Sequence, residues 1–281
     1  MYACIINLCS LGRSSKPFTT TIFMSATVTA TRQGFIKTLT ISNPSRKNAI
    51  SGAMARQLLA LVLETRDDDS RVVILEGDGK DFCAGADLDP SSLQGGFDVA
   101  EFLRSTYNPL VQAMRDMDKL FIAKVRGVAV GVGFNFALAC DLVYAAETAR
   151  FSQIFTQIGL STDGGGAYFM LERMGYHRAL ELMLTHRMIS GAEAGQWGII
   201  NQALPDEELD EAVEKMAALI ANGPFTALRN TKANVRAAAR GGLAAAVEQE
   251  AVSQGENFRT KDFFEGVAAF LQKRKPTFKG E

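Results

Sequence analysis

From residue 35 onward, short strand-like runs alternate with runs of helical periodicity, and this alternation constrains the fold more than any other feature of the chain. The run 35–41 has the period-two pattern of a half-buried strand. Residues 51–67 follow with leucines at helical spacing and with Ser51 as the expected N-cap. Strands are also predicted at 71–76, 121–125 and 141–145, and helices at 99–117 and 134–139. The repeated order predicts the α/β class.

After Gly164 the pattern is helical almost to the end of the chain. Helices are predicted at 167–174, 178–185, 192–197, 207–222, 224–240, 243–258 and 261–273. We therefore expect three parts, which are an N-terminal extension (1–33), an α/β core (34–205) and a helical C-terminal region (206–281).

The charge balance excludes some partners. With 30 basic and 31 acidic residues, the protein has no overall attraction for nucleic acid or for an anionic membrane. No apolar run is long enough to span a bilayer. The four cysteines show no metal-ligand spacing and are expected to be reduced thiols. The sequence suggests no metal and no redox cofactor.

The first 34 residues lack acidic side chains, and they carry three basic residues among many serines and threonines. This is the composition of an organelle transit segment. Alternatively, Met24 is the start of a cytosolic protein. A cytoplasmic and a mitochondrial location both stay open.

Two glycine-bracketed segments, 82–88 and 127–133, precede a lone acid, Asp163, in the run 161–166. Glycine lets backbone approach a ligand closely, and a helix that starts after the second segment would aim its positive end at that ligand. Two backbone N–H groups held in this way can stabilise the enolate oxygen of a thioester. The combination suggests an oxyanion hole with one proton carrier.

These motifs resemble the crotonase family, also called the enoyl-CoA hydratase/isomerase superfamily. The resemblance covers residues 35–281, and its marks are the segments 43–50, 82–88, 127–141, 151–166, 193–198 and 265–276. It implies a ββα spiral core, acyl-CoA substrates and a homotrimer, commonly paired into a hexamer, in which the helical C-terminal region (206–281) packs at the subunit contacts of the trimer. CoA would be part of the substrate rather than a cofactor.

The resemblance also implies roles for single residues. The oxyanion donors fall on the N–H groups of Ala86 and Val132, and the catalytic acid falls on Asp163. A valine at 132, where the family usually has glycine, keeps the N–H but requires ordinary dihedrals. The expected substrate-binding residues are Arg46, Lys47, Phe82, Ala84, Asp87, Gly131, Asn135, Phe155 and Lys273, of which Arg46, Lys47 and Lys273 would contact CoA phosphates.

Departures from the family pattern bear on the reaction. The two glutamates that hydratases use to activate water fall on Asn135 and Phe155, and neither side chain can exchange a proton near neutrality. Asp163 stands where the isomerase branch places its single acid. If Phe155, Ile158 and Leu160 line the same pocket, they would desolvate this carboxylate and make it a stronger base.

The leading hypothesis is therefore an enoyl-CoA isomerase, acting on linear 3-enoyl-CoA or on a ring acyl-CoA, in which Asp163 shuttles a proton. Asp163 could instead be a helix N-cap, and Asn135 a satisfied buried amide. The alternatives for function are an enoyl-CoA hydratase, an aryl-CoA dehalogenase-like hydrolase, and a catalytically silent protein that binds CoA or RNA. The dehalogenase needs a histidine, and none precedes His177.

Overall fold

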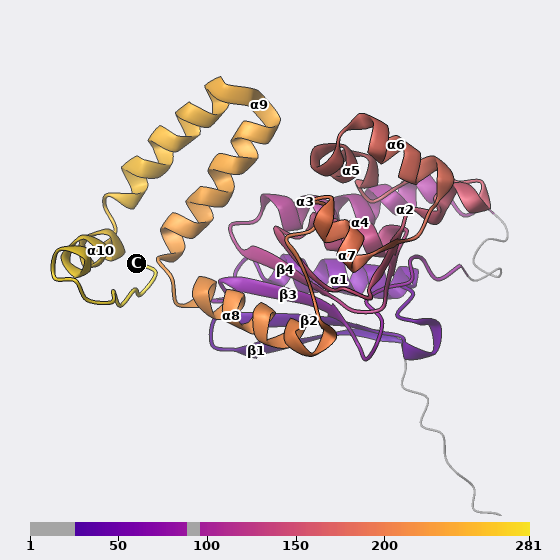
Figure 1. Ribbon diagram of the computed structural model, residues 1–281, viewed down its shortest axis with the longest axis horizontal. Helices are drawn as coiled ribbons and strands as arrows, with labels where there is room; N and C mark the ends of the chain where they lie inside the picture. The colour runs from indigo at the N-terminus through magenta and orange to yellow at the C-terminus, as the bar shows by residue number, and fades with distance from the viewer. Residues whose placement is uncertain (1–25, 89–95) are drawn as a thin grey trace, which may run out of the picture.

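The computed structural model describes residues 26–88 and 96–281, and its centre is a six-stranded sheet (Figure 1). The strand order is β1 (Thr27–Gln33), β2 (Ile36–Ser42), β3 (Val72–Gly77), β4 (Leu120–Val125), β6 (Leu142–Ala146) and β9 (Gln202–Leu204). Strand β1 is antiparallel to β2, and all other neighbours are parallel. The carboxyl ends of β2, β3, β4 and β6 therefore meet at one edge of the sheet.

A second, three-stranded sheet lies at that edge. It consists of β5 (Val128–Val130), β7 (Arg150–Ser152) and β8 (Ile189–Ser190). Strand β4 continues into β5 and then into a helix, α4 (Val132–Ala139), while β6 continues into β7. This is the expected order of two strands and a helix, and it places the start of α4 where the two sheets meet.

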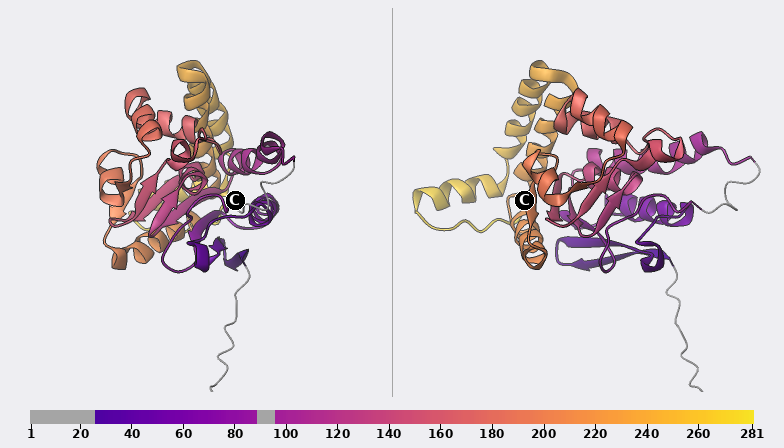
Figure 2. Two further views of the ribbon diagram at one scale, coloured as in Figure 1. Left: turned by 90° about the vertical axis from the view of Figure 1, so that its right-hand side faces the viewer. Right: turned by 45° about the vertical axis from the view of Figure 1, so that its right-hand side comes forward.

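Helices cover both faces of the large sheet (Figures 1 and 2). Helix α8 (Leu209–Ala221) packs against β2, β3, β4 and β6, while α1 (Gly52–Glu64) and α4 pack from the other face. The side chain of Ser51 caps α1, as predicted, by accepting a hydrogen bond from the N–H of Met54 at 3.3 Å. The other helices of the body are α2 (Val99–Ser105), α3 (Tyr107–Asp116), α5 (Gly166–Met174), α6 (Tyr176–Thr185) and α7 (Gly191–Gln196), with short 3-10 turns η1 (Pro44–Arg46), η2 (Ile154–Ile158) and η3 (Asp206–Glu208).

Helix α4 has no solvent-facing side. All eight of its residues are buried, and its two phenylalanines, Phe134 and Phe136, pack against rings from β7 and α3 respectively. A helix that is apolar all round belongs in the interior of a protein. Helix α4 therefore lies in the interior of the protein, and the surrounding segments pack against it.

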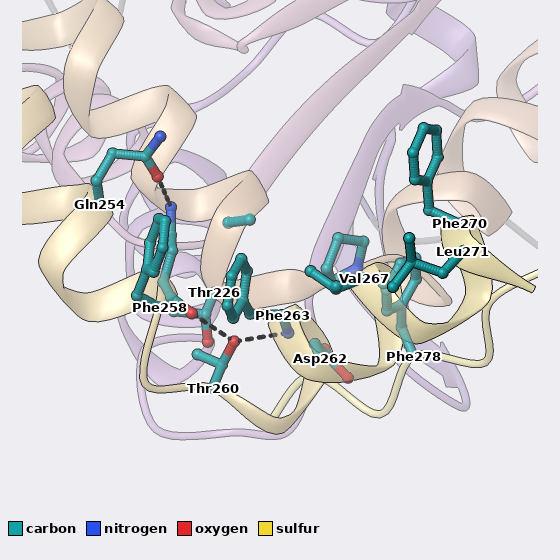
Figure 3. Close-up of a pocket in the computed structure, with 14 residues that line it drawn as sticks. Thr226, Gln254, Phe258, Thr260, Asp262, Phe263, Val267, Phe270, Leu271 and Phe278 are labelled. Carbon is teal, nitrogen blue, oxygen red and sulfur yellow. Dashed lines mark hydrogen bonds between the residues drawn. The ribbon is translucent and has the colours of Figure 1, made fainter.

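The C-terminal helices project from this body (Figures 1 and 2). Helix α9 (Phe225–Asn257) bends at Gly242, whose φ of 68° turns the chain back, so the two helices predicted here form the arms of a hairpin. Helix α10 (Lys261–Leu271) follows, and between α9 and α10 lies an apolar cleft of about 480 Å³ (Figure 3). Its walls include Phe258, Phe263, Val267, Phe270, Leu271 and Phe278.

The structure corrects several boundaries. Residues 27–33, expected in the N-terminal extension, form strand β1 of the main sheet. Helix α8, expected in the C-terminal region, covers the core sheet, so the projecting part begins only at α9. The helix predicted at 99–117 is two helices, because Thr106 has non-helical dihedrals of −130° and −75°. Among the described residues, no helix is both long and apolar enough to cross a membrane.

Candidate active site

Three backbone segments lie side by side at the carboxyl edge of the large sheet. Cys83 donates to the carbonyl of Val128 at 2.9 Å, and its own carbonyl accepts from Val130 at 3.0 Å. On the other side, Ala84 donates to the carbonyl of Lys47 at 3.0 Å, and Ile50 donates to that of Gly85 at 2.8 Å. These bonds bring together the two glycine-bracketed segments and the 43–50 turn, as the sequence analysis expects.

The glycines of these segments make a close approach possible. A Cβ added at Gly133 would lie 2.3 Å from the carbonyl oxygen of Cys83, so the first turn of α4 is pressed directly against the neighbouring segment. Gly131, with φ of 55° and ψ of −127°, has a positive φ that favours glycine just before the helix. Val132 is the first helical residue and has ordinary dihedrals, so the valine at this position is compatible with the local backbone.

The N–H groups of Ala86 and Val132 are available at this place. Val132 lies in the first turn of α4, where N–H groups have no intrahelical acceptor and the helix dipole is positive. Ala86 follows Gly85, whose φ is 100°, and Ala86 is exposed. Among the described residues, no hydrogen bond engages either N–H. Both groups are therefore free to donate to a ligand oxygen.

Asp163 is held against the same turn of α4. A Cβ added at the adjacent Gly164 would lie 3.1 Å from Cγ2 of Val132, so the loop and the helix are in direct contact. The Oδ1 atom of Asp163 is buried and has no hydrogen-bond partner within the part of the chain that the structure describes. Because burial penalises the charged form, it raises the pKa of this carboxyl from 3.8 to about 6. The N-cap of α5 is Gly165 rather than Asp163, which rules out the alternative capping role.

The hydrogen bonds of Asn135 argue against the predicted contact with substrate. Its Nδ2 donates to the carbonyl of Asp163 at 2.8 Å, and its Oδ1 accepts from Nε2 of Gln153 at 2.7 Å. Asn135 is completely buried. Both ends of the amide are used by protein groups, which is the satisfied buried amide that the sequence left open as an alternative.

The predicted apolar neighbours of Asp163 divide into two groups. Phe155 is buried and its ring lies 3.7 Å from the position of a Cβ at Gly131, so it packs beside the start of α4. Ile158 and Leu160 are half exposed, at 51% and 50%, so within this chain neither side chain is itself buried, and their place beside Asp163 stays a prediction. Tyr107 was not anticipated: its buried ring packs edge-on against Phe136, and burial, together with the charge of Asp163, raises the pKa of its hydroxyl.

The residues expected to bind CoA do not all gather at one place. Arg46 forms an ion pair with Asp87 at 2.9 Å, and Lys47, with φ of 51°, lies beside Ala84. Phe82 is fully buried, so its ring is not accessible to a ligand and this residue can contribute only its backbone.

Lys273 lies apart from the other predicted CoA residues. It follows α10, whose tail is bonded through the carbonyl of Lys279 to Arg71 at the amino end of β3. Figure 1 shows α10 at the opposite end of the molecule from α2. The prediction that Lys273 joins this site is therefore wrong within a single chain.

The positions of the histidines bear on the dehalogenase alternative, and the arrangement of possible metal ligands bears on metal binding. His177 and His186 are both exposed, and His177 lies on α6, outside the contacts that surround Asp163. Within residues 26–88 and 96–281, no group of three or more His, Cys, Asp and Glu side chains is arranged to hold a metal ion.

The two sheets, with α4 seated where they meet, define an α/β protein of the crotonase type. Residues 31–281 match the family model described as "Enoyl-CoA hydratase/isomerase". A Rhodobacter capsulatus protein named "Probable enoyl-CoA hydratase" is 38% identical over 242 residues, covering 86% of this chain and 93% of its own length. The 1,2-epoxyphenylacetyl-CoA isomerase of Escherichia coli K12 is 34% identical over 250 residues, with coverages of 88% and 95%.

The likeness extends to solved structures. The crystal structure of an enoyl-CoA hydratase from Bacillus anthracis matches with a TM-score of 0.85 at 29% identity, covering 90% of this chain and 99% of that one. The chain belongs to the enoyl-CoA hydratase/isomerase family, within the crotonase superfamily. It is accordingly an enzyme of acyl-CoA thioesters.

Proposed function

We propose that this enzyme is an enoyl-CoA isomerase in which Asp163 is the only proton carrier. The observation that carries the proposal is the carboxylate of Asp163, whose buried Oδ1 has no partner among the described residues and whose neighbour Gly164 lies against Val132 in the first turn of α4. The carboxylate takes a proton from C2 of a 3-enoyl thioester. The C2–H electron pair forms a C1–C2 double bond and the carbonyl π electrons move onto oxygen, which gives a dienolate that keeps the C3–C4 double bond until the proton returns. The protonated Asp163 then returns the proton at C4, which gives the 2-enoyl thioester.

The dienolate oxygen would accept hydrogen bonds from the N–H groups of Ala86 and Val132. Donors that are already oriented need no reorganisation as the negative charge develops, and burial strengthens their effect. A pKa near 6 suits Asp163 to its role, because the group is ionised at neutral pH but remains basic enough to accept a proton from carbon. In this scheme the proton that Asp163 removes from C2 is the proton that it returns to C4, so no further proton carrier is needed.

The hydratase alternative has less support. Hydration needs two groups that hold and activate water, and the family positions for them carry Asn135 and Phe155. The amide of Asn135 is engaged by Gln153 and by the Asp163 carbonyl, and the Phe155 ring is buried. The dehalogenase alternative needs a histidine near Asp163, whereas His177 and His186 are exposed.

Two classes of substrate, linear 3-enoyl-CoAs and ring acyl-CoAs, fit the proposal. The E. coli relative bears the name of an isomerase of a ring acyl-CoA, so the second group has support from a protein 34% identical to this chain. Arg46 and Lys47 are the proposed partners of the CoA phosphates.

We also propose that the protein assembles as a homotrimer or as a pair of trimers. The helices α9 and α10 expose large apolar side chains, among them Leu243, Phe264, Phe270 and Leu271. Faces of this kind are typical of subunit contacts. Lys273 would then approach a CoA site only across such a contact.

The test is turnover of matched 3-enoyl-CoA and 2-enoyl-CoA substrates in deuterated water, followed by NMR. The wild-type enzyme is expected to interconvert the two without 3-hydroxyacyl product, and Asp163→Asn to lose this activity. A dominant 3-hydroxyacyl product would support the hydratase instead. An Asp163→Asn enzyme as fast as wild type would refute the proton shuttle, and binding of acyl-CoA with no turnover by wild type would favour the silent binding protein.

A further inference from the structure

Three polar side chains from three different elements close a ring of hydrogen bonds beside Asp163. Nε2 of Gln153 donates to Oδ1 of Asn135 at 2.7 Å, Nδ2 of Asn135 approaches Oγ1 of Thr162 at 3.4 Å, and Oγ1 of Thr162 donates to Oε1 of Gln153 at 3.2 Å. Asn135 belongs to α4, Gln153 follows β7, and Thr162 lies in the loop before Asp163. The ring therefore joins the helix of the proposed oxyanion donor to the loop of the proposed acid.

The direction of each bond fixes both amide orientations. If the amide of Asn135 were flipped, its Nδ2 would face the donor Nε2 of Gln153, and if the amide of Gln153 were flipped, its Oε1 would face the acceptor Oδ1 of Asn135. Asn135 and Gln153 are 0% and 1% exposed, so water cannot replace a lost bond at their positions. A buried polar ring in which every member is satisfied holds a unique arrangement, and removal of one member leaves the others unpaired.

Asn135 extends the ring to Asp163 itself. Its Nδ2 also donates to the main-chain carbonyl of Asp163 at 2.8 Å, and this is the shorter of its two bonds. A glycine completes the packing, since a Cβ at Gly166 would lie 2.2 Å from Oγ1 of Thr162 and 2.6 Å from Nδ2 of Asn135. The backbone of the acid is thus fixed from the side of α4, while Oδ1 of its carboxylate receives no such bond from the residues that the structure describes.

We propose that the ring of Asn135, Gln153 and Thr162 is a positioning device that sets where the Asp163 carboxylate stands relative to the Val132 N–H. This inference rests on the proposed function of Asp163. It gives a reason for an amide at position 135, because a carboxylate there would have no hydrogen to donate to the Asp163 carbonyl and would face that oxygen with like charge. None of the three side chains needs to touch the substrate.

The experiment compares Thr162→Val, which removes the hydroxyl at nearly constant volume, with Thr162→Ser, which restores it. We expect kcat for isomerisation to fall about 10- to 100-fold in Thr162→Val, because small displacements of a catalytic group carry losses of that order. KM should change by less than about 2-fold, since binding contacts are kept. The acid limb of the kcat–pH profile should move, because the surroundings of Asp163 change, and Thr162→Ser should return both quantities toward wild type.

Two further variants separate positioning from a general loss of stability. Thr65→Val removes a buried hydroxyl that bonds to Leu61 at the end of α1, and it should leave kcat and the pH profile unchanged. Gln153→Glu keeps the acceptor for Thr162 but cannot donate to Asn135, so it should lower kcat in the same direction as Thr162→Val.

The outcomes distinguish the two levels of the proposal. If Asp163→Asn is inactive while Thr162→Val and Gln153→Glu keep the wild-type kcat and acid limb, the positioning role is refuted and the proposed function stands. If Thr65→Val loses as much activity as Thr162→Val, the positioning role is also refuted, since any lost buried hydroxyl then has the same effect. If Asp163→Asn is fully active, the proposed function falls and the positioning role falls with it.

Discussion

The buried acid should make the protein less stable at neutral pH than a variant without it. The pKa of Asp163 is raised from 3.8 in an exposed carboxyl to about 6 in the folded state, and the cause is burial. Between these two values the folded protein holds a proton that the unfolded chain has released. Stability therefore falls as the pH rises through this window, and the penalty is complete above pH 6.

The size of the effect follows from the shift. A difference of about 2 pKa units corresponds to about 3 kcal/mol at 1.36 kcal/mol per unit. Asp163→Asn, which is neutral at every pH, should raise the free energy of unfolding by up to about 3 kcal/mol at pH 7.5. This increase in the free energy of unfolding should become smaller as the pH falls from 6, and it should vanish near pH 4. At that pH the Asp163 carboxyl of the folded wild type is protonated and, like asparagine, uncharged.

The assay is urea-induced unfolding of wild type and Asp163→Asn at constant protein concentration from pH 4 to pH 8. Asp210→Asn is the matched control with the opposite sign, because ion pairs with Arg126 and Lys124 lower the pKa of Asp210 to about 2. That variant should be less stable than wild type at neutral pH. A stability difference for Asp163→Asn that is independent of pH, or a loss of stability at pH 7.5, would refute the argument that burial leaves this carboxylate uncompensated.

Three further perturbations test other parts of the structure. Gly133→Ala places a methyl group against the Cys83 carbonyl. It should lower the free energy of unfolding, measured by thermal unfolding, by about 1–3 kcal/mol and should remove most of kcat. Unchanged activity would show that α4 need not lie so close to the Cys83 segment. Lys232→Met removes the buried partner of Asp141 and should cost about 3–5 kcal/mol in urea unfolding, with a cost below 1 kcal/mol contradicting the burial of the pair. Arg46→Gln should raise KM for acyl-CoA about 2- to 5-fold with kcat unchanged in steady-state assays, and an unchanged KM would remove Arg46 from the CoA site.

The sequence predicts the helices and strands well where these elements are long and their apolar residues are periodic. Ser51 and the leucines of α1 predicted a helix and its N-cap, and the runs that became β2, β3, β4 and β6 were recognised as strands. The strands that were missed, β5, β7, β8 and β9, have two or three residues each, which is too short for a period-two pattern to register. Strand β1 was missed because its serine- and threonine-rich surroundings resemble a transit segment.

In the candidate site, the backbone arrangement was easier to predict than the contacts of the side chains. The close approach of the two backbone segments was predictable, since they are bracketed by glycines and the structure gives Gly85 and Gly131 positive φ angles, while the donor roles of Ala86 and Val132 stay a prediction. Side-chain roles were harder, because they depend on contacts between distant segments. Nothing in the local sequence indicates that Gln153 closes a ring with Asn135, although a glutamine beside a strand within an apolar run is a signal that a buried partner exists.

The complete burial of α4 has a consequence for how this enzyme can change. Because every residue from Val132 to Ala139 is packed on all sides, nearly any substitution there alters volume in the core, and there is no neutral face on which variation can accumulate. Directed evolution toward another acyl group would therefore find few tolerated changes in this helix. Productive variation would have to come from less tightly packed parts of the chain, such as α2, which has no buried residue, and the half-exposed Ile158.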